Sequence, residues 1–274
     1  PGLVELEEVG IDYVGFPVDG YQGWFDADDE ELTRIFYAGA YTAQLCMVPA
    51  DAQGNEMPLL VDGTKRDRRP WTGDLETSAL PAYLLFGDAG ATYPRETLRA
   101  ALRFQSPEGE LPGALESDGG NGVPYSVSYS IRTVIAMATH FMHTGDAGFA
   151  REVVAAAARQ LEWNESLVDR RGLLVTEQGP HFMTSTETSA SGADWDAYDP
   201  DKTGAVTAYN VLYVRALRGA ATLADAAGED RLAALWRERA TRTARAVDDV
   251  LWNEDTGLYD QSDVVRGTCA QDAN

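Results

Sequence analysis

After Asp28, hydrophobic residues recur every three or four positions, the spacing that places side chains on one face of an α-helix. The pattern predicts seven helices and the start of another at Ala270. The first begins with the acidic residues 28–31 and ends before Pro49; the others span 74–86, 95–104, 125–143, 149–163, 205–227 and 230–252. Residues 4–16 alternate instead and include β-branched side chains, which predicts a strand.

The helices come in pairs joined by short turns at Gly87-Asp88, Gly145-Asp146 and Gly228-Glu229. Glycine suits the left-handed position that ends a helix, and an acid suits the positive end of the next helix. Long loops separate the pairs. Three of them, at 108–111, 171–174 and 256–259, carry a glycine followed closely by an apolar residue, which predicts a small turn or hairpin.

This repeat predicts an all-α ring in which the apolar helix of each pair packs inside and the more polar one outside. The long loops then share one end of the ring, where a pocket can form, because loops on a rigid scaffold carry function. An open helical solenoid with a binding face is the alternative. We expect residues 1–20 to be a linker or a strand of a preceding β-domain, residues 21–274 to form the helical domain, and the ring to need helices beyond Asn274.

The formal net charge is −22 and the isoelectric point is near 4.4. Such a charge repels nucleic-acid phosphates and anionic membranes, and no apolar run is long enough to span a bilayer. We therefore expect neither nucleic acid nor membrane as a partner. Cys46 lies in an apolar helical run and is interpreted as a small buried hydrophobe.

The densest chemistry lies in residues 61–74, a loop that runs into a predicted helix. It contains three acids, four basic residues and Trp71 within fourteen positions. Alternating charges in a pocket loop can fix one another's ionisation and orient a ligand that carries hydroxyl groups. A surface network of ion pairs is the simpler interpretation, but Trp71 and the Gly73-Asp74 helix start favour a binding site.

The stretch D-G-T-K-R-D-R-R-P-W-T-G-D, from Asp62 to Asp74, resembles the D-C-P-Q-R-D-E-R-x-G-W-T-G-D motif of bacterial α-L-rhamnosidases of glycoside hydrolase family 78. It is closer still to a divergent branch that has D-G-x-K-R-D-R. Residues 35–42 and the Gly192–Trp195 segment also resemble family segments. The resemblance implies an (α/α)6 toroid of six helical hairpins, incomplete in this chain, and inverting hydrolysis of terminal α-L-rhamnosides.

One departure concerns the general acid. The family motif has a Glu after R-D, where this chain has Arg68, which cannot donate a proton in that role. We favour Asp67 as the acid; Asp74 or Asp62 with altered geometry remains open. Inversion also needs a second carboxyl group about 6.5–9.5 Å away to activate water. The resemblance implies that this base is a Glu beyond Asn274.

By the same resemblance, Asp62, Arg66 and Asp74 hydrogen-bond the sugar, while Trp71 and Trp195, with Asp194 beside the latter, pack on it. We expect a carbohydrate substrate, no cofactor and no metal; His140 and His143 are interpreted as stabilising a helix C-terminus. Two alternatives stay open: a glycosidase of the same fold with another sugar specificity, and a carbohydrate-binding domain without catalysis. The oligomeric state and a cytoplasmic or secreted bacterial location are not decided by the sequence.

Overall fold

The structure, a computed structural model, describes residues 9–10, 15–16, 20–116, 120, 125–176, 202–268 and 270–274. Within these ranges the α-helices are α1 (Glu30–Leu45), α2 (Leu75–Leu102), α3 (Val127–Thr144), α4 (Ala147–Ser166), α5 (Thr207–Ala227) and α6 (Asp230–Leu251). Strands β1 (Met47–Val48) and β2 (Leu59–Leu60) pair antiparallel, as do β3 (Trp252–Asn253) and β4 (Leu258–Tyr259). The predicted all-α class is confirmed; most of the strand predicted at 4–16 lies outside the described residues.

Helix α2 contains both members of one predicted pair. Gly87 has φ 55° and ψ −139° inside it, so the chain turns there and resumes as a helix at once. The predicted start of the second member at Arg95 is therefore wrong, since residues 88–94 are already helical. Pro94, which lacks an amide hydrogen and is of a type common in the first turn of helices, lies inside this one.

The other two short turns are formed as the sequence predicts. Gly145 (φ 66°) ends α3 and Gly228 (φ 80°) ends α5, both in the left-handed conformation. After Gly145, the Asp146 carboxylate accepts a hydrogen bond from the Phe149 amide at 2.9 Å and caps α4. At the predicted start near Ala270 only a 3₁₀ turn forms, Gln271–Ala273.

The first half of α2, α3 and α5 run in the same direction. The start of α3 contacts the start of α2 through Tyr129 and Asp74, and their far ends meet through His140 and Tyr83. Helix α3 also packs along α5. The long connections thus lead into the three inner helices at one end, and the short glycine turns lie at the other.

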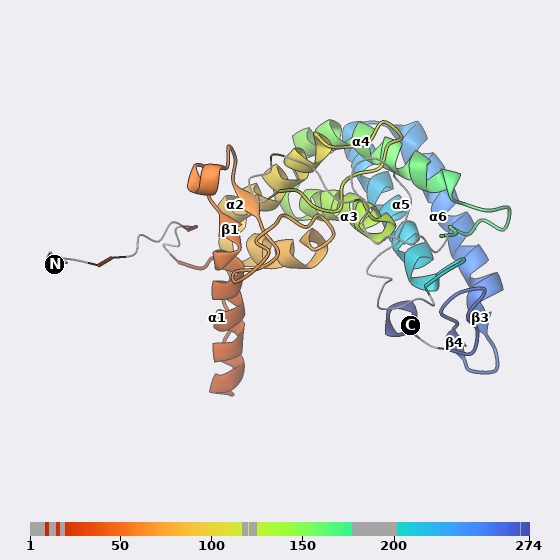
Figure 1. The fold of residues 1–274 in the computed structure, drawn as a ribbon, viewed down its shortest axis with the longest axis horizontal. Coiled ribbons are helices and arrows are strands. Elements are labelled where there is room, and N and C mark those ends of the chain that lie inside the picture. The colour runs from red at the N-terminus through yellow and green to blue at the C-terminus, as the bar shows by residue number, and fades with distance from the viewer. Residues whose placement is uncertain are drawn as a thin grey trace, which may run out of the picture.

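The helices follow an arc from α1 through α3 to α6, with the second half of α2, α4 and α6 on the outer side (Figure 1). The core between the two layers contains large side chains of α4, α5 and α6, notably Phe149, Tyr209, Tyr213 and Trp236. No helix in the described part of the chain is long and apolar enough to cross a membrane.

The three glycine turns predicted in the long loops are confirmed. Gly109, Gly172 and Gly257 all have positive φ. Val168 and Leu174 bridge across the second turn, and β3 and β4 form a hairpin across the third. Cys46 is buried, as expected, and burial raises the pKa of its thiol.

Candidate active site

Residues 61–74 form a closed loop before α2. The Asp62 amide donates to the Arg69 carbonyl at 2.9 Å, and the Arg69 amide donates back to the Asp62 carboxylate at 3.0 Å. These two bonds join the ends of the 62–69 segment. Asp62 is half-buried, and one of its carboxylate oxygens is engaged in holding the loop closed.

The tip of this loop is strained. The Arg68 amide donates to the Arg66 carbonyl at 2.8 Å, which closes a three-residue γ-turn around Asp67. Asp67 has φ 60° and Arg68 has φ 50°, values that residues other than glycine seldom adopt. Asp67 and Arg66 are exposed, and neither side chain has a hydrogen bond or ion pair within the described residues. Strain of this kind concentrates at functional sites.

Arg68 turns away from the tip and braces the loop from inside. Its guanidinium donates to the Thr64 carbonyl at 3.1 Å, and its Nε is buried. It also lies near the Cys46 thiol. Burial and Asp62 raise the pKa of that thiol, and the positive charge of Arg68 lowers it. At the position where the family motif has a carboxylic acid, this chain therefore has a structural residue.

Trp71 and Asp74 meet through the first turn of α3. The Trp71 ring packs edge-on against the ring of Tyr129, with centroids 5.8 Å apart, and the Arg69 guanidinium lies 5.7 Å from the Trp71 ring. The Tyr129 hydroxyl donates to the Asp74 carboxylate at 3.0 Å. Tyr129 thus orients both a flat ring and a hydrogen-bond acceptor.

A second loop, residues 106–116, holds the motif loop in place through hydrogen bonds to Thr72. The buried Thr72 donates through its hydroxyl to the Pro112 carbonyl at 2.7 Å and through its amide to the Gly113 carbonyl at 2.8 Å. The same loop carries Glu110, which is only 1% exposed. Burial, with a smaller effect of Glu108, raises the pKa of Glu110 to about 8.

The chain matches a known family and several solved structures. The sequence model described as the bacterial alpha-L-rhamnosidase 6 hairpin glycosidase domain matches residues 21–271. The chain belongs to this family.

Among solved structures, a GH78-family rhamnosidase of Bacillus sp. GL1 is similar, with TM-score 0.72 and 24% identity over 92% of this chain. A rhamnosidase from Klebsiella oxytoca with rhamnose bound has TM-score 0.72 and 22% identity over 93% of this chain. The chain spans 24% and 44% of those two structures, so it covers less than half of either. No curated protein matches the chain.

Asp62, Arg66, Asp67, Trp71 and Asp74 all lie on the one loop before α2, and Trp71 and Asp74 share Tyr129 as a partner. Asp194 and Trp195 lie outside the described residues. That all seven residues meet at one site stays a prediction.

Sequence reasoning missed Tyr129 and the supporting residue Glu110. Tyr129 occupies the first turn of the helix that follows the second long loop, and its only sequence signal is that place beside the motif loop. Glu110 gives no sequence signal, because its burial depends on how two loops fold together. The sequence also gave no indication of the ion-pair cluster around Glu76, two residues after Asp74.

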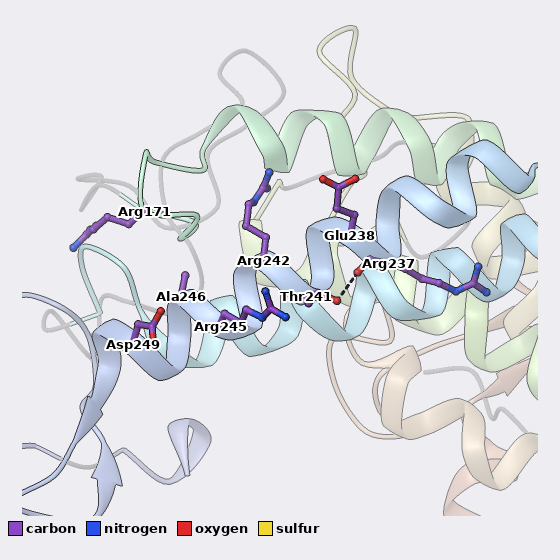
Figure 2. A pocket seen from close by; sticks show the side chains of 8 residues that line it. All are labelled: Arg171, Arg237, Glu238, Thr241, Arg242, Arg245, Ala246 and Asp249. Carbon is purple, nitrogen blue, oxygen red and sulfur yellow. Dashed lines mark hydrogen bonds between the residues drawn. The ribbon is translucent and has the colours of Figure 1, made fainter.

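A groove of about 590 Å³ lies elsewhere, along the outer face of α6 (Figure 2). It is lined by Arg171, Arg237, Arg242 and Arg245 together with Glu238, Thr241, Ala246 and Asp249. The arginine side chains point in different directions (Figure 2). Arg171, Arg237 and Arg242 pair with the acids Asp263, Asp225 and Glu165, outside the groove lining. The groove is thus a solvated surface of ion pairs, and no residue of the motif loop lines it.

Proposed function

We propose that this domain belongs to a glycoside hydrolase that cleaves terminal α-L-rhamnosides with inversion. The membership of residues 21–271 in the rhamnosidase family supports the substrate class. The bound rhamnose in the Klebsiella oxytoca relative supports it further. The main observation behind the proposal is Asp67 at the tip of the motif loop, which is strained, exposed and without a partner among the described residues.

In this proposal Asp67 is the general acid. A proton donor must approach the glycosidic oxygen, so its carboxyl group has to be free of internal partners and accessible. Asp67 meets both conditions within the described residues, whereas Asp62 accepts a bond from its own loop and Asp74 accepts one from Tyr129. The γ-turn fixes the backbone at Asp67 and so limits the directions that its short side chain can take.

Asp74 and Trp71 then bind the sugar. The hydrogen bond from the Tyr129 hydroxyl holds the Asp74 carboxylate in place. A charged carboxylate accepts stronger hydrogen bonds than a neutral group does, so Asp74 is suited to bind sugar hydroxyl groups. The half-buried Trp71 ring offers an apolar face to C–H groups of the sugar. Asp62 and Arg66 contribute further hydrogen bonds, and Asp194 and Trp195 complete the predicted set.

The test is hydrolysis of an aryl α-L-rhamnoside by the full-length protein and its Asp67→Asn variant. Asparagine tolerates positive φ as well as aspartate does, so the substitution removes the acid and keeps the turn. We expect kcat/KM to fall by at least about a hundredfold. Asp51→Asn is the matched control, because Asp51 is also exposed, has φ 65° and lies in the same connection outside the motif.

Each alternative predicts another outcome. Full activity in Asp67→Asn would transfer the acid role to Asp74 or Asp62. Cleavage of another glycoside, with the rhamnoside untouched, would keep the reaction and change the sugar. Glycan binding without turnover of any glycoside would show a domain that binds carbohydrate without catalysis.

A further inference from the structure

A charged cluster joins the three inner helices close to Asp74. Glu76, in the first turn of α2, binds Arg132 of α3 through one carboxylate oxygen and Arg215 of α5 through the other. The Glu76 side chain is only 12% exposed. One carboxylate thereby holds two guanidinium groups that come from different helices.

This cluster is adjacent to the candidate active site. Glu76 follows Asp74 by two residues, and Arg132 follows Tyr129 by three, which is close to one helical turn or about 5 Å along the axis. Helical side chains lean toward the N-terminus of their helix. Arg132 and Arg215 therefore reach toward the end where α2 begins and where Tyr129 holds Asp74.

The two arginines keep unused hydrogen-bond donors. A guanidinium group has five N–H donors, and Glu76 contacts a single nitrogen of each arginine. Arg132 is 33% and Arg215 52% exposed, and within the described residues neither has another partner. Two cations around one anion leave one net positive charge, in a chain whose overall charge is −22.

We propose that Arg132 and Arg215 form a subsite for the carboxylate of an acidic sugar, a uronate bonded to the rhamnose that is released. Guanidinium groups recognise planar carboxylates through paired hydrogen bonds, and Glu76 holds the two groups in place for this contact. The inference rests on the proposed function, because it specifies the neighbour of the cleaved sugar. A clasp that only stabilises the helices would give no preference for acidic substrates.

The experiment compares rhamnosyl-glucuronate with rhamnosyl-glucose as substrates of the full-length protein. We expect kcat/KM to favour the acidic disaccharide by at least about tenfold, mostly through KM. Arg215→Gln should bring the ratio to near one. Arg218→Gln should leave it unchanged, because Arg218 is an exposed arginine one turn further along α5 and outside the cluster.

A second measurement separates this inference from the proposed function. Saturation-transfer NMR with free glucuronate and glucose reports on the subsite without any turnover. Cleavage of the neutral aryl rhamnoside without a preference for the acidic disaccharide would leave the proposed function intact and overturn the subsite. A preference that survives Arg215→Gln, or that Arg218→Gln removes equally, would overturn it too. Glucuronate binding that depends on Arg215, in a protein that cleaves no rhamnoside, would support the subsite alone.

Discussion

Gly73, in the middle of the W-T-G-D stretch, lies directly against the ring of Tyr129. A Cβ atom at this position would stand 2.4 Å from Cδ1 of that ring, closer than atoms can approach. The glycine is therefore required by the contact that brings Tyr129 to both Trp71 and Asp74.

We predict that Gly73→Ala displaces Tyr129 and breaks its hydrogen bond to Asp74. Overpacking of this kind costs about 1–3 kcal/mol of unfolding free energy, measurable by chemical denaturation, and rhamnoside hydrolysis should fall with it. Gly39→Ala is the opposite case, because nothing lies within 4 Å of its added Cβ in α1. The unfolding free energy of that variant should rise by up to about 1 kcal/mol. Equal effects of the two substitutions would contradict the argument.

Glu110 predicts a pH dependence of stability. Its folded-state pKa of about 8 lies above the ordinary value of 4.5, so the folded state binds its proton more tightly than the unfolded state does. Below pH 4.5 both states are protonated and the group has no effect. As the pH rises toward 8, unfolding becomes easier, by on the order of 5 kcal/mol in all.

Glu110→Gln removes this titration. We expect its unfolding free energy, measured by urea denaturation from pH 5 to pH 9, to exceed that of the wild type increasingly up to about pH 8. Glu108→Gln, at an exposed neighbour, should change the pH profile only slightly. Parallel profiles for the wild type and Glu110→Gln would show that the Glu110 carboxyl group ionises freely in the folded state.

At the residue scale, the sequence singled out residues 61–74 as the candidate site but did not show how their side chains are placed. The motif pointed to Asp62, Asp67, Trp71 and Asp74 because their types and spacing are visible in the chain. The inward direction of Arg68 depends on the carbonyl of Thr64 and on the burial of the loop interior. Such three-dimensional contacts leave no trace in residue spacing.

Among the elements, Gly87 has the conformation least available to other residues. Its φ of 55° and ψ of −139° fall in a region used almost only by glycine, and an added Cβ would lie 2.0 Å from the Gln22 side chain. Gly228 ends α5 at φ 80° with open space around it. The two turns therefore differ in how strictly they need glycine.

We predict that Gly87→Ala lowers the unfolding free energy by about 2 kcal/mol or more, whereas Gly228→Ala costs about 1 kcal/mol. Thermal unfolding followed by circular dichroism measures both. The control is built into the pair, since each replaces a glycine with positive φ between two helices. A loss of unfolding free energy in Gly228→Ala as large as that in Gly87→Ala would refute the ranking.

Helix existence was predictable, and helix limits were less so. Apolar periodicity gave every inner helix, because those faces are buried against neighbours over many turns. The start of the second half of α2 was misplaced by several residues. Its first turns, residues 88–93, are rich in small residues, and their helical state is decided by packing against the preceding half, where Gly90 lies against Ala82 and Phe86.

For the whole molecule, the charge imbalance predicts a response to salt. There are 44 acidic and 22 basic residues, so the folded chain repels itself at low ionic strength. Surface ion pairs such as Arg99–Glu152 oppose this but contribute little each. Screening shortens the range of the repulsion from about 10 Å at 0.1 M salt to about 3 Å at 1 M.

We predict that raising NaCl from 0.05 to 0.5 M increases the midpoint of thermal unfolding by about 2–4 °C, which corresponds to roughly 1 kcal/mol. Sucrose at equal osmolality is the control for effects other than charge. A midpoint that falls with NaCl would show that attractive ion pairs outweigh the net repulsion.

The global architecture followed from the sequence because long and short connections alternate along the chain. This alternation predicts inner helices that start at a common end, and Tyr129–Asp74 and His140–Tyr83 mark the two ends in space. The arc of hairpins in Figure 1 agrees with that expectation. The sharing of Glu76 between Arg132 and Arg215 was not predictable, because it depends on the relative heights of three helices.

The division of the two ends has a consequence for how such a scaffold diversifies. Insertions, deletions and exchanges in the segments that enter the inner helices leave the packed wall untouched, because its alignment is held by compact glycine corners at the opposite end. Remodelling one rim alone can therefore change what such a scaffold binds, while the glycine corners of the opposite rim keep the helices aligned.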